Sequence, residues 1–351
     1  MKPPLSASAE LFRTVVPIPR RTERLLAHDE PLLLLGSCFA QSIGERLISS
    51  GHPATFNPLG IMYNPTSLRQ SLEHLVAGEI DDASLRWCPD QQLHFSFETH
   101  SSLAQPTREA AHAAVGAATR SGHDALRRSA CLFLTVGSAW AYEHRELGRI
   151  VANCHRQPSD QFDRRLLGVA EATDELRRTV AVARTFDASL PIVLTVSPVR
   201  YWREGAVPSA RSKAHLLTAV HAVADELAGV SYFPAYELVL DELRDYRWFK
   251  EDMLHPSDQA VDYVWRRLQD AHFRPADVGV RREVQQLRAA ATHRVSRPGS
   301  AAARSFAATQ REAVARLLAE HPHLEPLLEM ERRHFDEEAG EPSGHAEAGG
   351  S

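Results

Sequence analysis

Short apolar runs that end at a chain-breaking residue recur along the chain, and helical patterns follow them. The first run, residues 32–35, ends at Gly36 and precedes residues 39–47, in which apolar positions recur every four residues. This pattern predicts a buried strand, a tight turn and an amphipathic helix. Further strands are predicted at 54–56, 131–136, 192–196 and 230–233, and further helices near 66–77, 107–128, 159–186 and 209–228. Strand runs without polar alternation indicate burial on both faces of a sheet.

The alternation of strands and helices predicts the fold class. Such an order forms right-handed crossovers and an open parallel sheet with helices on both faces. We therefore predict a flavodoxin-like, doubly wound α/β/α sandwich of three layers. Because ligands of such sheets bind beyond the carboxyl ends of the strands, chemistry is expected directly after the apolar runs, at 36–38, 57–60, 137–140 and 197–200.

Changes in composition divide the chain into four parts. Residues 1–30 are predicted to form an extended N-terminal segment, and residues 31–272 carry the predicted sheet. Residues 273–335 are rich in Arg, Ala and Glu and predict an appended helical region, which is a candidate for self-association. Residues 336–351 are acidic and lack aromatic residues, which predicts a disordered tail.

Composition and charge narrow the class of protein. The chain has 351 residues, of which 43% are hydrophobic, and a net charge of −5 at pH 7. A nucleic-acid partner is not expected, because phosphate neutralisation needs a basic excess or a basic stripe. No run approaches the roughly 20 apolar residues that cross a bilayer, and the N-terminus lacks a basic region followed by an apolar core. We therefore expect a cytoplasmic protein without a membrane span.

Two residues that suit a nucleophile lie on the turn after the first predicted strand. Ser37 and Cys38 fall where the first N–H groups and the positive dipole end of a helix are expected. A helix N-terminus and a nearby imidazolium both lower the pKa of a thiol, whereas a serine needs an adjacent base. The structural alternative is that Ser37 only caps the helix. The four cysteines are too few and too widely spaced for a disulfide scaffold, so free thiols are expected.

A candidate base lies further along the chain. Asp252 precedes His255 by three residues, so both side chains can point the same way from one turn of chain. A carboxylate that orients an imidazole leaves the other ring nitrogen to face a nucleophile, as in a catalytic triad. Alone, the pair also fits a His-Pro turn with a local carboxylate cap, and it gains weight only together with the turn at 36–38.

Several motifs, taken in order, resemble a known family. The sequence Gly-Ser-Cys-Phe-Ala at 36–40 reads as the signature of the GSCFA family, and the resemblance continues through residues 57–65, 136–140, 153–156, 195–200 and 252–256. The family resembles a branch of the SGNH (GDSL-like) hydrolases, which are flavodoxin-like α/β/α proteins that act on esters or move acyl groups. With this resemblance we expect neither a metal nor an organic cofactor.

The resemblance implies roles for residues of this chain. Laid on the first SGNH block, which reads Gly-Asp-Ser-Leu, Cys38 takes the place of the nucleophilic serine. A shift of one residue would make Ser37 the nucleophile, and we favour Cys38. The final SGNH block, Asp-x-x-His, matches Asp252 and His255.

The oxyanion hole that the resemblance implies is incomplete. Gly60 can take the position of the SGNH glycine, but the asparagine of the third block is missing from residues 137–139. Ser138 and Asn153 are candidate replacements. One oxyanion donor typically contributes about 3 kcal/mol to the lowering of the barrier. Fast ester hydrolysis therefore requires that another donor takes the place of the missing asparagine.

Three further residues are candidates for substrate binding. Arg200 follows a predicted strand and suits a carboxylate or phosphate group. Asn57 and His155 lie within motifs of the resemblance. Lys213 is interpreted instead as half of a surface salt bridge on a loop.

A metal site on the same residues is an alternative interpretation. Cys154 and His155 would have to join Cys38 and His255 as ligands. Close pairs such as C-x2-C or H-x3-H, which are typical of structural zinc sites, do not occur in this sequence. A metal is therefore not expected.

These observations lead to one function and one alternative. The first is an SGNH-like hydrolase or acyltransferase that acts on a small-molecule or carrier-bound ester or thioester through a covalent acyl-enzyme. The alternative is a non-catalytic ligand- or partner-binding protein on the same fold, since a fold does not imply a function. A position of His255 within hydrogen-bonding reach of Cys38 or Ser37 would favour the enzyme.

Overall fold

The computed structural model describes residues 14–19, 24–203, 205–293 and 299–340. The chain forms two compact units, which are treated separately below. The sheet unit comprises residues 1–22, 31–44 and 54–271, and the helical unit comprises residues 23–30, 45–53 and 272–351, so far as these are described. The sequence also predicts a boundary near residue 272. In the structure, two short segments from the N-terminal part of the chain belong to the helical unit as well.

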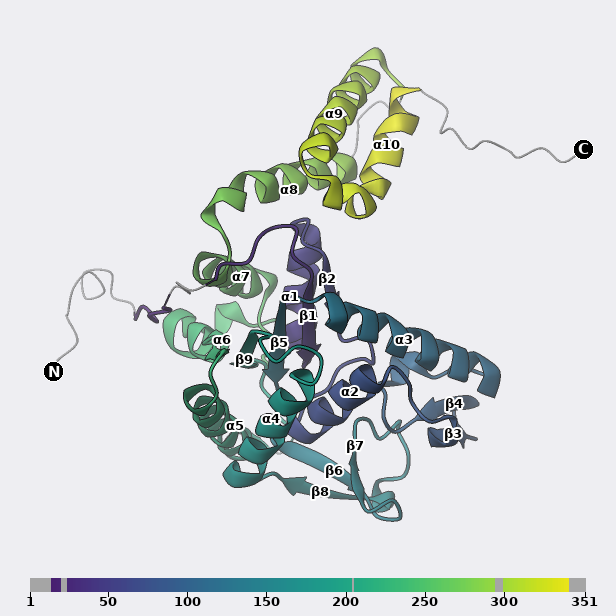
Figure 1. Ribbon diagram of the computed structural model, residues 1–351, viewed down its shortest axis with the longest axis vertical. Coiled ribbons are helices and arrows are strands. Elements are labelled where there is room, and N and C mark those ends of the chain that lie inside the picture. Colours follow the sequence, from purple (N-terminus) through teal and green to yellow (C-terminus); the bar gives the residue numbers. More distant parts are fainter. Residues whose placement is uncertain (1–13, 20–23, 204, 294–298, 341–351) are drawn as a thin grey trace, which may run out of the picture. The chain divides into compact units, whose positions relative to one another are not determined.

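A five-stranded parallel sheet forms the centre of the sheet unit (Figure 1). Its strands are β1 (Leu32–Gly36), β2 (Ala54–Phe56), β5 (Cys131–Val136), β9 (Ile192–Val196) and β10 (Val230–Tyr232). They lie in the order β10-β9-β5-β1-β2, and every neighbouring pair is parallel. This is the strand order of flavodoxin-like doubly wound sheets, in which the order reverses between β1 and β5. The predicted fold class is therefore confirmed.

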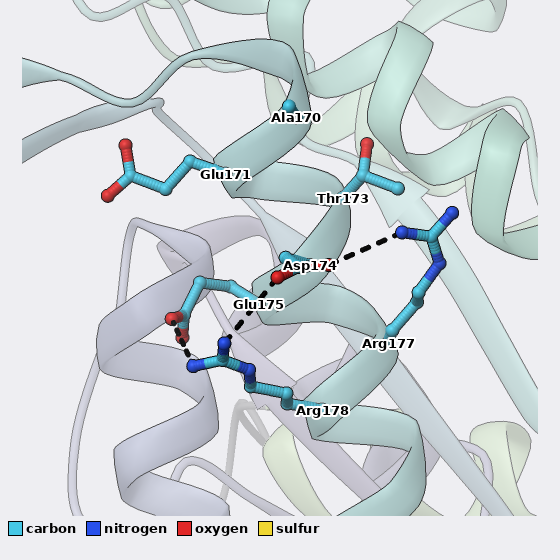
Figure 2. Close-up of a pocket in the computed structure, with 7 residues that line it drawn as sticks. All are labelled: Ala170, Glu171, Thr173, Asp174, Glu175, Arg177 and Arg178. Carbon is cyan, nitrogen blue, oxygen red and sulfur yellow. Dashed lines mark hydrogen bonds and ion pairs between the residues drawn. The ribbon is translucent and has the colours of Figure 1, made fainter.

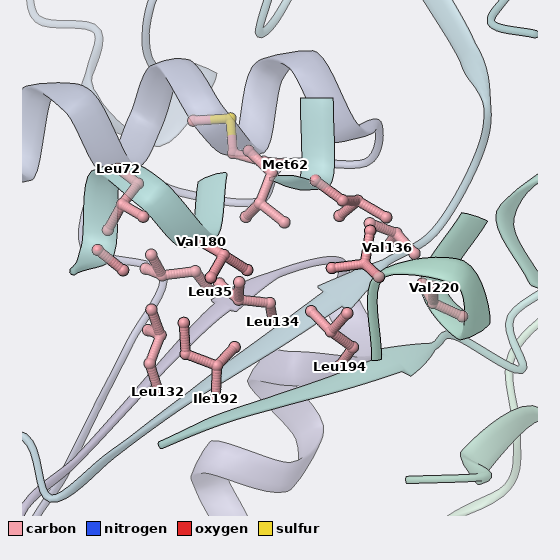
Figure 3. Packing of buried hydrophobic residues seen from close by; sticks show 14 of the residues in the cluster. Leu35, Met62, Leu72, Leu132, Leu134, Val136, Val180, Ile192, Leu194 and Val220 are labelled. Carbon is pink, nitrogen blue, oxygen red and sulfur yellow. The ribbon is translucent and has the colours of Figure 1, made fainter. Parts of the chain in front are cut away.

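Helices flank this sheet, and a continuous apolar core joins several of them to it. The helices are α1 (Cys38–Ser49), α2 (Pro65–Ala77), α3 (Arg108–Arg128), α4 (Val169–Ala183), α5 (Ala206–Glu226), α6 (Ala235–Glu237) and α7 (Asp258–His272). Apolar side chains of α2, α3, α4 and α5 pack against β1, β5 and β9, and Figure 3 shows this packing for residues of α2, α4 and α5. The core includes Leu35, Met62, Leu72, Leu134, Val180, Leu194 and Val220. Burial of each such side chain stabilises the folded chain by roughly 1.5–3 kcal/mol. This packing holds the strand ends that carry the site in place.

Two smaller antiparallel sheets interrupt the alternation of strands and helices. They are the pair β3 (Leu85–Cys88) and β4 (Leu93–Ser96), and the sheet β7-β6-β8 formed by β6 (Trp140–His144), β7 (Arg149–Val151) and β8 (Phe162–Leu166). The helix predicted over 159–186 is wrong in its first part, because β8 occupies residues 162–166. The register sets Tyr142 opposite Arg164, and the Arg164 guanidinium lies 4.1 Å from the centroid of the Trp140 ring. These cross-strand contacts outweigh the local helical pattern.

The helical unit is built mainly from the C-terminal part of the chain. Its helices are α8 (Val278–Thr292), α9 (Ala301–Glu320) and α10 (Glu329–Ala339). They pack around Val284, Leu317, Leu324 and Phe335. The predicted disordered tail begins too early at residue 336, because α10 continues to Ala339, and residues 341–351 lie outside the described part of the chain. Of the helices described, none has both the length and the apolar character that crossing a membrane requires.

Three histidines lie together in the helical unit. Nε2 of His28 lies 2.9 Å from the carbonyl oxygen of Ser50, and Nδ1 of His28 lies 2.8 Å from Nε2 of His323. Because a carbonyl only accepts, Nε2 of His28 carries the hydrogen and Nδ1 accepts from His323. The His52 ring lies against the His28 ring, with centroids 4.4 Å apart. Burial lowers the pKa of His28 to about 4, and it lowers the pKa of His52 well below the usual value.

Acidification to pH 5 is expected to destabilise the protein through His28. Its pKa is about 4 in the folded chain against an ordinary 6.5, so the unfolded chain binds the proton more readily. The contribution of His28 to the free energy of unfolding therefore decreases as the pH is lowered from 6.5 towards 4. At pH 5 the loss from this residue amounts to about 2 kcal/mol. Urea unfolding at pH 7 and pH 5 measures the loss. The midpoint of the parent should fall further than that of His28→Gln, and equal falls would contradict the role of His28.

Candidate active site

The turn after β1 places Ser37 and Cys38 at the carboxyl edge of the parallel sheet. Gly36 has a φ of +133°, and a Cβ at this position would stand 2.0 Å from the carbonyl oxygen of Thr135. Only glycine therefore fits between β1 and β5 at this point. The Ser37 N–H donates to the same oxygen at 3.0 Å, and Cys38 begins α1. We call residues 36–38 the nucleophile turn, and it lies where doubly wound sheets bind ligands.

The two candidate nucleophiles have different surroundings. The Ser37 hydroxyl accepts a hydrogen bond from the Phe39 N–H at 3.3 Å, and Ser37 is only 1% exposed. This is the capping role that the sequence left open for Ser37. Cys38 is half-buried and its thiol is free. The geometry therefore favours Cys38 over Ser37 as the nucleophile.

Opposing influences set the charge of Cys38. Burial raises the pKa of its thiol above the ordinary value, and this effect prevails. The Lys213 ammonium acts against burial, as do the backbone N–H groups of Cys38 and Phe39, because all of these favour the thiolate. The expectation of a lowered pKa is therefore wrong in direction. That expectation took the helix N-terminus into account but not the desolvation of the sulfur, which raises the pKa.

Lys213 is buried at the carboxyl ends of β5 and β9. It is 4% exposed, and its Nζ donates to the carbonyl oxygens of Gly137 and Ser197, each at 2.6 Å. The interpretation of Lys213 as a surface salt bridge is therefore wrong. A signal was present in the sequence, since Lys213 shares a face of α5 with the buried Leu216 and Val220. Desolvation lowers the pKa of Lys213 to about 7.

Asp252 holds the ring of His255, as the sequence predicts. Oδ2 of Asp252 lies 2.6 Å from Nδ1 of His255, while Oδ1 accepts the N–H groups of His255 at 3.0 Å and Leu254 at 2.8 Å. These two backbone hydrogen bonds, followed by the one from the imidazole, lower the pKa of Asp252 to about 2. Because the carboxylate accepts from Nδ1, a neutral ring keeps its lone pair on Nε2, where a general base needs it.

Cys38 and His255 line one pocket of about 300 Å³, which we call the Cys38 pocket. Its lining residues are Ser37, Cys38, Tyr63, Gly137, Ser138, Ser197, Val199, Arg200, Tyr201, Trp202, Arg203, Leu254 and His255. They come from the turns after β1, β5 and β9, from the segment before α2 and from the loop before α7. Within the described residues no hydrogen bond joins the thiol to the imidazole. The contact that would favour the enzyme is therefore not observed among the described residues, and such contacts often form only when substrate is bound.

The backbone donors expected for an oxyanion are already engaged. The Gly60 N–H donates to the carbonyl oxygen of Asn57 at 2.8 Å. The Ser138 N–H donates to the carbonyl oxygen of Tyr63 at 2.9 Å, and the Ser138 hydroxyl accepts a backbone N–H at 3.1 Å. The N–H of Cys38 favours the thiolate form of its own side chain. This makes it a candidate donor to an oxyanion formed at Cys38.

Of the predicted substrate ligands, Arg200 lines the Cys38 pocket and Asn57 does not. Arg200 lines the Cys38 pocket, and its guanidinium packs on the rings of Trp202 and Phe249, 4.9 and 5.2 Å from their centroids. Asn57 has a φ of 45°, and its Oδ1 accepts the N–H of Gly36 at 2.8 Å. Asn57 thus supports the nucleophile turn from behind, which makes it a positioning residue rather than a substrate ligand.

His155 is a buried structural histidine. Its ring stacks on Phe95 with centroids 4.3 Å apart, and its Nε2 lies 2.8 and 3.0 Å from the carbonyl oxygens of Ser96 and Thr99. Burial lowers its pKa to about 4. The neutral ring therefore anchors its loop, and the geometry does not support a role in substrate binding.

A second pocket of about 350 Å³ adjoins the first, and we call it the side pocket. It is lined by Tyr63, Asn64, Ser138, Trp140, Tyr142, Val151, Ala152, Asn153, Cys154, Arg156, Gln157, Ser159, Phe162, Tyr201 and Arg203. Asn153 lies here, and its Oδ1 accepts the N–H of His155 at 2.8 Å. Burial raises the pKa of the Cys154 thiol to about 11, so this second thiol stays protonated at neutral pH.

A larger depression of about 720 Å³ lies over α4 (Figure 2). Figure 2 shows the seven side chains that line it. Asp174 pairs with Arg177 at 3.3 Å and with Arg178 at 3.5 Å. This surface is a network of paired charges without a nucleophile and base, and no function is assigned to it.

The four candidate metal ligands do not share one site. Cys38 and His255 line the Cys38 pocket, Cys154 lines the side pocket, and His155 is buried. In the part of the chain that the structure describes, no three or more His, Cys, Asp or Glu side chains are grouped so as to hold a metal ion.

Comparison with known proteins identifies the family. No curated protein matches the chain. The model of the GSCFA family matches residues 31–268, a range that contains the nucleophile turn, Lys213 and the pair of Asp252 and His255. The match spans the parallel sheet from β1 to β10 and ends within α7. The chain therefore belongs to the GSCFA family.

Proposed function

We propose that this protein is an SGNH-like hydrolase or acyltransferase that acts on an ester or thioester through a covalent acyl-enzyme on Cys38. One observation supports the proposal above others. A half-buried thiol at a helix N-terminus and an imidazole held by a carboxylate line the same pocket. This pocket lies at the edge of the sheet where ligands bind in doubly wound folds.

In the first step, the sulfur of Cys38 attacks the acyl carbonyl carbon. Nε2 of His255 takes the thiol proton, the S–C bond forms, and the N–H of Cys38 donates to the oxygen that gains negative charge. The C–O or C–S bond to the leaving group then breaks, and His255 gives the proton to that group. The products are a thioester on Cys38 and a free alcohol or thiol.

In the second step, water or an acceptor hydroxyl attacks this thioester. His255 accepts the proton of the attacking group, the S–C bond breaks, and the proton passes from His255 to the sulfur. Attack by water releases the acid, and attack by an acceptor forms a new ester. Asp252 keeps the Nδ1–H of His255 in place in both steps.

The raised pKa of Cys38 is consistent with a sulfur that ionises only when its base is engaged. Lys213 favours the thiolate, and the thiolate in turn raises the pKa of Lys213. The two charges therefore stabilise each other. In this scheme the thiol is protected while the pocket is empty and becomes reactive when His255 removes its proton.

A second candidate is a non-catalytic binding protein on the same fold. Three observations favour it. Within the described residues no hydrogen bond joins the Cys38 thiol to the His255 imidazole. Burial raises the pKa of Cys38, and the N–H groups of Gly60 and Ser138 are engaged by backbone carbonyls. Such a protein would use the pockets for recognition without forming a covalent bond.

Trapping of the acyl-enzyme separates the two candidates. The protein is mixed with p-nitrophenyl acetate or with an acetyl thioester, quenched in acid and mapped by peptide mass spectrometry. We expect acetylation of Cys38 in the parent and none at this position in Cys38→Ala. Cys154→Ala is the matched control and should acetylate like the parent, because the high pKa of Cys154 keeps it protonated. An unmodified Cys38 with every acyl probe would favour the binding protein.

A further inference from the structure

Arginines and no carboxylates line the two adjoining pockets. Arg200 and Arg203 line the Cys38 pocket, and Arg156 and Arg203 line the side pocket. No Asp or Glu occurs among the described residues that line either pocket. Guanidinium groups in a pocket without carboxylates create a local field that attracts anions.

Hydrogen-bond donors form one wall of the side pocket. Tyr142 accepts a hydrogen bond from Nη1 of Arg203, and its oxygen lies 3.3 Å from the hydroxyl oxygen of Tyr201. Burial raises the pKa of Tyr142 to about 12, so its hydroxyl remains a donor at neutral pH. The Arg164 guanidinium lies over the rings of Trp140 and Tyr201, 4.1 and 5.5 Å from their centroids, and adds positive charge along this aromatic wall.

A constrained loop places Arg156 in the side pocket. Arg156 and His155 have φ values of 55° and 50°, which residues other than glycine seldom adopt. The hydrogen bonds of His155 to Ser96 and Thr99 hold this conformation. Such backbone strain is typical of functional sites. Within the described residues, no carboxylate pairs with Arg156.

We propose that the side pocket binds an oxyanion on the alcohol or thiol portion of the substrate, the portion released when Cys38 is acylated. The assignment of that portion rests on the proposed function, because the acyl group then occupies the Cys38 pocket. The pockets share Tyr63, Ser138, Tyr201 and Arg203, so one molecule can extend through both. Guanidinium and phenol donors bind phosphate and carboxylate alike, and the chemistry common to both is a planar or tetrahedral group of anionic oxygens.

Three probes with the same ring test this site. Phenyl phosphate, phenylacetate and benzyl alcohol are titrated by calorimetry into the full-length Cys38→Ala protein, in which no acyl-enzyme can form. The preferred anion should bind at least about ten-fold more tightly than the alcohol, as expected for hydrogen bonds to a charged group. Preference for phenyl phosphate indicates a phosphorylated substrate, and preference for phenylacetate indicates a carboxylated one.

Variants of Arg156 locate the anion. Arg156→Gln should weaken the preferred anion about ten-fold without affecting the alcohol, and Arg156→Lys, which keeps the charge but not the planar fork, should fall between Arg156→Gln and the protein with Arg156. Arg145→Gln is the matched control, since it removes an exposed arginine that follows β6 and pairs with Asp163 at 2.8 Å.

Two results would overturn the proposal. One is equal affinity for all three probes, and the other is an equal effect of Arg156→Gln and Arg145→Gln. The outcome is distinguishable from failure of the proposed function. Anion binding that depends on Arg156, together with an unmodified Cys38 in the trapping experiment, would reject the acyl-enzyme and retain the anion site.

Discussion

Replacement of Cys38 by alanine is expected to lower the turnover of an acyl ester by at least about 1,000-fold, because the sulfur forms the covalent intermediate. Without a nucleophile, only substrate binding and the oxyanion donor remain to accelerate the reaction. Initial rates with p-nitrophenyl acetate, or with any acyl substrate that the parent accepts, measure the effect.

Ser37→Ala is the control for this experiment, one residue earlier on the same turn. The Ser37 hydroxyl caps α1, so its loss should reduce the free energy of unfolding by about 1 kcal/mol and leave turnover close to that of the parent. An inactive Ser37→Ala beside an active Cys38→Ala would show that the nucleophile is the serine and that the favoured alignment is wrong by one residue.

Removal of the imidazole has the second largest expected effect. His255→Ala should lower turnover by about 100- to 10,000-fold, because the imidazole that shares the pocket with Cys38 is then lost as the general base. The remaining activity should increase with pH, since hydroxide then replaces the missing base. A pH–rate profile of parent and variant between pH 6 and pH 9 measures both effects.

His112→Ala provides the comparison for His255→Ala. His112 lies on α3 with an exposed side chain, so its removal tests for a general effect of losing a histidine. Equal turnover of the His255→Ala and His112→Ala proteins would remove His255 from the mechanism and would favour the binding protein.

The central sheet could be predicted because its strands satisfy a local rule. The observed β1, Leu32–Gly36, is an unbroken apolar run, and β5, Cys131–Val136, is apolar except for Thr135. Burial on both faces of the sheet demands that composition. The strand β8 obeys no such rule, since Asp163, Arg164 and Arg165 interrupt it. It is a strand because it pairs with β6, and this pairing depends on a partner more than fifteen residues away.

Some features of the candidate site could likewise be predicted from the sequence, and others could not. The Asp252 and His255 contact lies within one turn of chain, and its geometry could be inferred from spacing. The hydrogen-bond acceptor of the Gly60 N–H could not be inferred from spacing, because it depends on the path of the loop from Asn57. Nor does spacing reveal the net pKa of Cys38, which depends on how much water the folded chain removes from the sulfur.

The buried amine of Lys213 allows the shape and the charge of the site to vary separately. Its Nζ bonds two carbonyl oxygens, and an uncharged amine still has two hydrogens, so both bonds can persist after its proton leaves. Because the pKa of Lys213 is about 7, this change falls within the physiological range. A rise in pH can therefore remove a cation from beside the sulfur while the ends of β5 and β9 stay tied together, which makes the response to pH one of reactivity and not of conformation.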